Sequence, residues 1–343
     1  MKTKPRSIYI HIPFCRRKCS YCDFVSFDNK TAGETSKYID ALCNEIKNAN
    51  LESDTVFETI FFGGGTPSIL NNAQISKIFE VLPKANEITI EANPNSITEA
   101  KLCHWLSLGI NRLSIGVQSF NNEVLKALGR THTAKQAFNA VALAHKVGFR
   151  NINIDLIHSI NTVPLKIPSE IFKYITHVSA YCLTPAKVED SESIKQQKQI
   201  ELILAVQGFE KYEVSNFARP GFQCRHNLAY WQPQTHEYIG FGVGAHSFAG
   251  GERFSNTSSF DEYLSGSTRD SSGGVVKSPR NDMTEVIMLG LRTTHGVEVG
   301  LLENKVSEIQ MLKDLKLVKE ENGRISATSK GFFVLNLITE KLT

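Results

Sequence analysis

Apolar segments with the character of buried strands alternate with segments of helical spacing over most of the chain. The predicted strands cover residues 7–14, 55–62, 87–91, 112–118, 151–157 and 177–183. Between them, apolar residues recur every three or four positions, which predicts amphipathic helices. These helices are expected at residues 34–50, about 72–82, from 98 onward, about 121–148, 167–175 and 196–209. Six strand–helix units predict a parallel sheet in an α/β fold, arranged as an incomplete (β/α)6 barrel.

The first helix illustrates the pattern. Tyr38, Leu42 and Ile46 lie on one face, and Thr35 or Ser36 is the expected N-terminal cap. A residue that caps a helix accepts a hydrogen bond from a backbone N–H that has no partner inside the helix.

The pattern changes near residue 213, where residues 213–217 are predicted to close the sheet. We therefore predict a barrel domain over 1–216 and a connecting region over 217–280, rich in glycine, serine and aromatic residues. The polar stretch 267–274 is expected to be a loop or linker. Residues 281–343 predict three helices and two short strands, around Leu317 and Ile325, which favours a small winged-helix-like domain.

Three cysteines follow the first predicted strand with the spacing C-x3-C-x2-C. Cys15, Cys19 and Cys22 have no fourth cysteine beside them, because the position two after Cys22 is Phe24. Thiolates are soft ligands that suit zinc or iron–sulfur clusters. A structural zinc site normally needs four protein ligands, whereas three cysteines suit a four-iron cluster with one open iron. The alternatives are a zinc site completed by His11 or three unrelated buried thiols.

Polar residues and glycines fall at the ends of the predicted strands. Gly63, Gly64 and Gly65 follow the second strand, and the next three strands end at or near Glu91, Gln118 and Asp155. In β/α barrels the C-terminal ends of the strands build the active site. Each of these residues alone reads as a surface or capping residue, but their joint placement predicts one functional face.

Composition and charge exclude several classes of protein. The 343 residues carry a net charge of +3, which predicts neither a nucleic-acid footprint nor a membrane surface. No apolar run reaches the eighteen or so residues that a membrane helix needs. Seven cysteines, an odd number with three close together, favour metal binding in a reducing compartment. We therefore expect a cytoplasmic protein.

The cysteine motif and Gly-Gly-Gly-Thr-Pro at residues 63–67 together resemble the radical S-adenosylmethionine (SAM) family. The likeness extends from Tyr9 to Leu342 and is nearest to the group of oxygen-independent coproporphyrinogen III dehydrogenases and HemW-type heme chaperones. It implies a [4Fe-4S] cluster on the three cysteines, with SAM on the fourth iron. Phe14 and Phe24 would flank the cluster and keep water away.

The resemblance also implies the residues that contact SAM. Gly64, Gly65 and Thr66 would contact its methionine part, Tyr9 and Tyr21 would lie beside it, and Arg130 would pair with its carboxylate. Gln118 and Asp155 would bind the ribose hydroxyls of SAM, and Glu91 would bind another of its polar groups. The backbone near Thr184 would reach the adenine.

A second motif points to heme. The stretch from His226 to Trp231 matches the H-N-x-x-Y-W motif of the chaperone group, in which His226, Tyr230 and Trp231 are the heme candidates. Imidazole is a common ligand of heme iron, and aromatic rings offer flat faces to a porphyrin. The alternative is that His226 satisfies a buried polar group while the two aromatic residues fill the core. His246, in Gly-Val-Gly-Ala-His-Ser, is either a second candidate or structural.

Two features favour a chaperone over a dehydrogenase. The dehydrogenases call for a cysteine at the position of Phe24 and for a long N-terminal arm, whereas about eight residues precede Tyr9. The resemblance then implies heme delivery to apo-hemoproteins and, through such acceptors, contact with a membrane surface. The alternatives are a coproporphyrinogen III dehydrogenase and a non-catalytic iron–sulfur or zinc scaffold.

One segment departs from the family pattern. After Asp155 the chain reads Leu-Ile-His-Ser-Ile-Asn-Thr in place of a Gly-Leu-Pro-Gly-Gln-Thr-like loop, and the span to Glu213 is short. We expect part of the barrel wall near the SAM site to be abbreviated.

Overall fold

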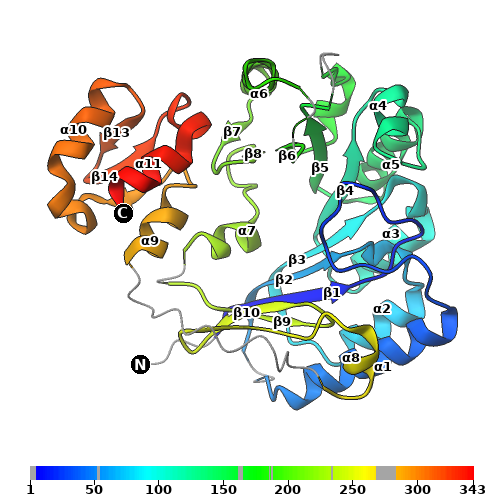
Figure 1. The fold of residues 1–343 in the computed structure, drawn as a ribbon. Helices are drawn as coiled ribbons and strands as arrows, with labels where there is room; N and C mark the ends of the chain where they lie inside the picture. Colours follow the sequence, from blue (N-terminus) through cyan, green and yellow to red (C-terminus); the bar gives the residue numbers. More distant parts are fainter. Residues whose placement is uncertain are drawn as a thin grey trace.

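The main structural element of the chain is a curved, mostly parallel β-sheet (Figure 1). The computed structural model describes residues 5–51, 55–160, 165–184, 186, 188–232, 235–267 and 283–343. Six parallel strands lie side by side in chain order: β1 (Ser7–Ile12), β2 (Phe57–Gly64), β3 (Ala85–Ala92), β4 (Arg112–Gln118), β5 (Asn151–His158) and β6 (His177–Cys182). The predicted strand order and the parallel pairing are confirmed.

Helices pack on the outer side of this sheet (Figure 1). They are α1 (Ala32–Asn48), α2 (Asn72–Phe79), α3 (Glu99–Ser107), α4 (Asn122–Ala127), α5 (Ala134–Val147) and α6 (Asp190–Val206). Tyr38, Leu42 and Ile46 of α1 are all buried, as their spacing predicts. The predicted cap of this helix was wrong, because Thr31 accepts from the Glu34 N–H in a capping box.

The crossover between β5 and β6 has little helix. The helix expected at 167–175 is a five-residue 3-10 helix, η3 (Ser169–Lys173). Two further 3-10 turns, η1 (Pro67–Ile69) and η2 (Pro94–Ser96), follow β2 and β3. Ser159, the residue directly after β5, has a left-handed backbone (φ +63°), and its N–H donates to Gln196 Oε1 at 2.9 Å. This strained residue turns the chain out of the sheet in the segment where we expected a departure from the family pattern.

Short strands extend the sheet at both ends but do not close it. On one side, β8 (Asn216–Ala218) pairs antiparallel with β6, and β7 (Glu210–Lys211) follows. On the other side, β9 (Tyr238–Phe241) pairs parallel with β1, followed by antiparallel β10 (His246–Ala249) and β11 (Glu252–Ser255). The edges are β7 and β11, so the barrel is incomplete, as predicted.

The expected connecting region, 217–280, thus contributes strands to the barrel sheet. It also holds two short helices, α7 (Arg225–Tyr230) and α8 (Phe260–Leu264). The predicted linker beyond Ser267 and the boundary near residue 280 lie outside the described residues. The division of the chain into three domains stays a prediction.

The C-terminal part has its own core. It consists of α9 (Met283–Gly290), η4 (Val299–Lys305), α10 (Val306–Asp314), η5 (Gly331–Val334) and α11 (Leu335–Leu342), with a sheet in the order β12 (Val297–Glu298), β14 (Arg324–Ala327), β13 (Val318–Glu321). This mixture of helices and a small antiparallel sheet agrees with the winged-helix-like expectation. It contacts the end of the barrel sheet, where Glu213 and Thr293 form a backbone bridge (Figure 1).

Candidate cofactor and ligand site

The cysteine loop leaves the C-terminal end of β1 and lies across the mouth of the sheet (Figure 1). Its base is fixed by backbone hydrogen bonds, of which one runs from Cys15 N to Phe27 O at 2.9 Å. Cys15, Cys19 and Cys22 are half-buried and form no disulfide. Burial raises the pKa of the Cys15 and Cys22 thiols. The three predicted ligands therefore lie on one ordered loop.

Two polar side chains, from segments just beyond the ends of β2 and α4, reach the cysteine sulfurs. Thr66 Oγ1 lies 3.7 Å from Cys15 Sγ, and Arg130 Nη1 donates to Cys19 Sγ at 3.7 Å. Asn93 links the two groups, since its amide nitrogen donates to Thr66 Oγ1 at 3.1 Å and its oxygen accepts from Arg130. Hydrogen-bond donors and a guanidinium beside a sulfur favour the thiolate that a metal needs.

Three thiols are the number that a four-iron cluster with one open iron would use. Among the described residues, no three His, Cys, Asp or Glu side chains converge as ligands of one metal ion would. A [4Fe-4S] cluster binds each cysteine through a different iron and does not need that convergence. His11, the alternative fourth zinc ligand, has both ring nitrogens engaged, with Val25 O at 2.8 Å and the Tyr9 hydroxyl at 3.1 Å.

The flank of the cysteine loop differs from our expectation. Phe14 is buried, but Phe24 is 65% exposed. Only Phe14 can shield a cluster from water. Phe24 instead lines the mouth of a cavity described below.

The glycines after β2 allow close packing against the base of the cysteine loop. A Cβ on Gly64 would lie 2.7 Å from the His11 ring, and Gly64 also has a left-handed backbone (φ +109°). A Cβ on Gly65 would lie 2.8 Å from Phe14 O. These glycines are therefore needed for packing within the protein itself, since only glycine fits between β2 and β1 here.

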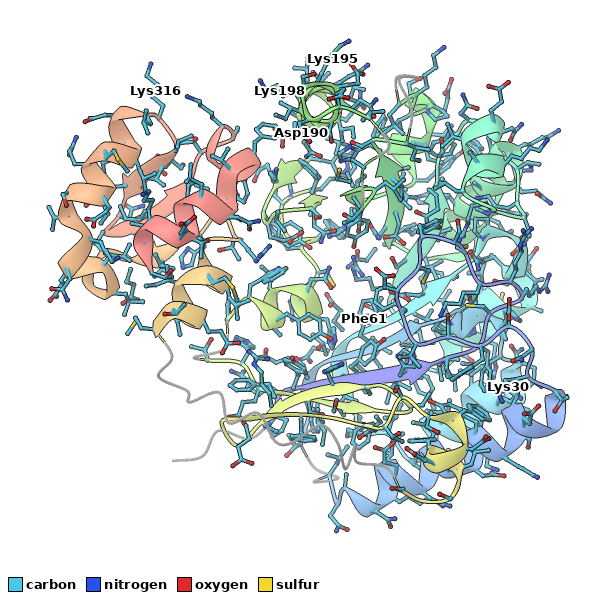
Figure 2. All side chains as sticks on the ribbon, viewed as in Figure 1. Lys30, Phe61, Asp190, Lys195, Lys198 and Lys316 are labelled. Carbon is cyan, nitrogen blue, oxygen red and sulfur yellow. The ribbon has the colours of Figure 1, made fainter. Side chains whose placement is uncertain are left out.

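A cavity of about 490 Å³ opens on the concave side of the sheet, within the usual range for ligand pockets. Its floor is polar and its walls are largely aromatic. The floor includes Glu91, Arg112, Ser114, Asn153, Asp155 and Ser179, and the walls include Tyr9, Phe24, Phe61, Tyr181, Tyr230 and Tyr238. Figure 2 shows Phe61 on this concave side, towards α7.

Two carboxyl groups in the floor hold their protons unusually well. Burial, and secondly the charge of Asp155, raise the pKa of Glu91 to about 8. Burial also raises the pKa of Asp155, although Asn153 Nδ2 donates to it at 2.8 Å. Neutral carboxyls can donate as well as accept hydrogen bonds, which suits hydroxyl-bearing ligands.

Arg112 is a floor residue that we did not single out from the sequence. It is only 2% exposed, and its Nε has no hydrogen-bond partner. The nearby buried carboxylate of Glu87 accepts from the backbone N–H groups of Arg225 and His226 at 3.3 Å. A buried guanidinium at the floor would attract an acidic ligand group.

Most of the residues proposed to contact SAM line one of two cavities. Tyr9, Gly64, Glu91 and Asp155 line the large cavity. A second cavity of about 20 Å³ lies beside Cys19, and Arg16, Arg17, Thr66, Asn93 and Arg130 are among its lining residues.

Four candidates line neither cavity, namely Tyr21, Gly65, Gln118 and Thr184. Gln118 has a left-handed backbone (φ +65°) that ends β4, and a Cβ on Gly116 would lie 3.0 Å from its amide. Thr184 is exposed.

Of the heme candidates, His226 and Tyr230 line the large cavity and Trp231 does not. His226 is 1% exposed, and its ring nitrogens bond to the Thr59 hydroxyl at 2.6 Å and the Tyr230 hydroxyl at 2.9 Å. Burial, and secondly the charge of Arg112, lower the pKa of His226 to about 3, so its imidazole is neutral at physiological pH. Trp231 lies outside the cavity lining and stacks near the Arg292 guanidinium.

Some of these residues carry a signal that sequence analysis missed. Arg112 and Ser114, and likewise Asn153 and Asp155, are two positions apart on a strand and so share a face. That alternation alone would have placed Arg112 and Asn153 beside the predicted site residues.

Comparison with known proteins identifies the family. Residues 9–173 match the radical SAM superfamily, and residues 278–334 match the HemN C-terminal domain. A protein of Lactococcus lactis subsp. lactis (strain IL1403) named heme chaperone HemW is 34% identical, over 99% of this chain and 98% of its own. The chain belongs to the HemW family of radical SAM proteins. A relative of the same name from Escherichia coli (strain K12) is 38% identical, over 72% of this chain and 71% of its own.

The HemW family assignment agrees with the structure. The solved coproporphyrinogen III oxidase HemN from Escherichia coli, described as a radical SAM enzyme, has a TM-score of 0.77 at 23% identity, covering 99% of this chain and 90% of its own. This likeness shows the shared fold. The Lactococcus alignment spans 380 positions against 343 residues here, so that HemW contains segments that this chain lacks. Among the described residues, no helix is long and apolar enough to span a bilayer.

Proposed function

We propose that the chain is a heme chaperone that carries a [4Fe-4S] cluster and SAM, and that hands heme to apo-hemoproteins in the cytoplasm or at a membrane surface. The observation that carries this proposal is the 34% identity to a heme chaperone over 99% of the chain. The cysteine loop and the aromatic cavity supply side chains of the required chemistry.

The three cysteines would each hold one iron through a thiolate. When bound, such a cluster supplies one-electron chemistry, whose potential depends on hydrogen bonds to the sulfurs and on exposure to water. In this chain Thr66 and Arg130 provide the hydrogen bonds, and Asn93 holds both in position. Phe14 excludes water from one side.

SAM would lie between the cysteine loop and the cavity floor. The guanidinium of Arg130 would pair with its carboxylate, while Gly64, Gly65 and Thr66 would contact the methionine part. The carboxyls of Glu91 on β3 and Asp155 on β5 face the cavity. Asp155 would take a ribose hydroxyl, and Glu91 would hold another polar group of SAM. Tyr9, Tyr21, Gln118 and the backbone at Thr184 complete the proposed SAM site.

The experiment is anaerobic reconstitution of the full chain, followed by iron, sulfide and SAM analysis and by hemin titration. The triple variant Cys15→Ala, Cys19→Ala, Cys22→Ala should lose iron and sulfide together, and Cys43→Ala is the matched control because Cys43 is buried elsewhere. Transfer is then tested by mixing the heme-loaded protein with an apo-hemoprotein and following its absorption spectrum. A triple variant that keeps its cluster, or a wild type that binds zinc instead of iron, would contradict the proposal.

A second assay separates chaperone from dehydrogenase. The same protein is given coproporphyrinogen III, SAM and a reductant, and protoporphyrin fluorescence is read after oxidation. We expect SAM binding without accumulation of product. Product over many turnovers would replace the chaperone proposal by a radical decarboxylation.

A further inference from the structure

Three histidines line the large cavity, and they differ in whether a ring nitrogen is free. They are His11, His226 and His246. Iron ligation needs a nitrogen lone pair that points into open space. The choice among the three can therefore be made from their hydrogen bonds.

In His226, the histidine of the H-N-x-x-Y-W motif, neither ring nitrogen is free. Thr59 lies 2.6 Å from Nδ1 and Tyr230 lies 2.9 Å from Nε2, so both nitrogens are occupied. Its ring also stacks on Phe61, with the centroids 4.9 Å apart. An iron at His226 would have to displace a buried hydroxyl, which would then lose its partner. Both ring nitrogens of His11 are likewise occupied by hydrogen bonds.

His246 is open. It is the first residue of β10, its side chain is exposed, and no hydrogen bond to its ring is found within the described part of the chain. It therefore offers a free imidazole at the mouth of the cavity.

The loop that carries His246 is held by hydrogen bonds of its backbone. Gly244 N–H donates to Thr257 O and Asn256 N–H donates to Ala245 O, both at 2.8 Å. Val243 N–H donates to the buried Tyr38 hydroxyl at 3.1 Å. A ligand presented by a fixed backbone loses little conformational freedom when it binds.

The surroundings of His246 suit a flat apolar ligand. Phe24, Val25 and Tyr238 line the same cavity. Gly244 packs so closely on Val25 that a Cβ would lie 2.8 Å from its Cγ2. The exposed Phe24 and the end of the cysteine loop are thus next to the His246 loop. Phe24 is the largest exposed apolar side chain there, as expected for a contact with a porphyrin face.

We infer that His246, rather than His226, supplies the imidazole that binds the heme iron. This inference rests on the proposed function, since it assigns the ligand of the same cargo. His226 then has a positioning role, holding Tyr230 and Phe61 in the cavity wall. Heme at His246 would lie beside residues 24–25, at the end of the loop that holds the cysteines.

The test is a titration of the reconstituted full-length protein with ferric hemin, read from the Soret band and from electron paramagnetic resonance. His246→Ala should lose the imidazole-ligated spectrum and bind hemin about tenfold or more weakly. Added imidazole should restore the spectrum, because it supplies the missing ligand without any change in the fold. Because His226 and Tyr230 belong to the cavity wall, the readout for His226→Gln and Tyr230→Phe is the ligation signature and not the affinity for hemin. Both variants should keep the imidazole-ligated spectrum, and circular dichroism checks that each variant is folded.

The outcomes separate the two proposals. A wild type that binds no hemin overturns the proposed function itself. A wild type that binds hemin and a His246→Ala variant with an unchanged spectrum overturn only the assignment to His246. If His226→Gln alone, in folded form, loses the imidazole signature, the motif histidine is the ligand.

Discussion

Glu91 is a carboxylic acid that keeps its proton at neutral pH, since burial and Asp155 raise its pKa to about 8. Its ordinary pKa of 4.5 returns on unfolding. Between these values the folded state binds more protons than the unfolded state, so the free energy of unfolding falls as pH rises. We expect Glu91→Gln to remove this fall, as measured by urea denaturation at several pH values between 4.5 and about 8.

The comparison between variant and wild type isolates Glu91. Below their ordinary pKa of 6.5, buried histidines such as His226 make the free energy of unfolding rise with pH, but they do so equally in the variant and the wild type. Parallel stability profiles for the two proteins would show that Glu91 is ionised in the folded state at neutral pH.

Gly64 is the glycine whose replacement should cost most at the site. Gly64→Ala forces a left-handed alanine against the His11 ring, and we expect a loss of about 1–3 kcal/mol in the free energy of unfolding. Gly33→Ala is the matched control, because its Cβ would meet nothing nearer than 4.0 Å and should change stability by about 1 kcal/mol or less. Equal losses in the two variants, measured by denaturant titration, would refute the packing argument.

The sequence led to the cysteines and to the strand-end acids because motif spacing and strand pattern point to them directly. It did not lead to Asn93, whose importance comes from hydrogen bonds to Thr66 and Arg130, residues 27 and 37 positions away. Nor did it distinguish His226 from His246, because that difference lies in which ring nitrogens are occupied. Such contacts between distant parts of the chain leave no local pattern.

The start of α1 provides a test of helix capping. Thr31→Ala removes the hydroxyl that accepts from Glu34 N–H, and we expect about 0.5–2 kcal/mol less stability by thermal or urea unfolding. The control is Thr35→Ala, since Thr35 is one of the two caps, with Ser36, that the sequence suggested. Its exposed hydroxyl only donates to Thr31 O, so its effect should be within about 0.5 kcal/mol. A larger loss for Thr35→Ala would reverse the assignment.

Elements with a long apolar pattern were predicted well, and short ones were not. Strand β4 has the predicted bounds, Arg112–Gln118, because its seven residues run through the core. Strands β9, β10 and β11 have four residues each and are joined by glycine-rich turns, which is too short for a period to show. Their place in the sheet depends on β9, which pairs with β1, more than 200 residues earlier in the chain, while β10 pairs with β9 and β11 with β10.

Lys211 of β7 takes part in the contact between the barrel and the C-terminal part. Its ammonium pairs with Glu201 at 2.7 Å and lies 4.6 Å from the centre of the Phe332 ring. Both charged side chains are less than one fifth exposed. Lys211→Met should therefore lower stability by about 1–3 kcal/mol and loosen the contact with Phe332.

Lys195→Met is the control for this contact. Lys195 of α6 also pairs with a glutamate, Glu192, but its side chain is 76% exposed (Figure 2). Its loss should cost less than about 0.5 kcal/mol. Thermal unfolding together with limited proteolysis checks both variants, and equal behaviour would show that Lys211 does not join the two parts.

The pairing of β9 with β1 also affects how the chain is made. Ser7 pairs with Tyr238, so a ribosome working at about 5–20 residues per second needs roughly 10–50 s to supply the partner strand. During that time the nascent chain exposes one edge of an apolar strand, and such edges promote association with other chains. A fragment that ends near residue 216 would keep this edge open permanently. It should aggregate during synthesis, although it contains all six parallel β/α units.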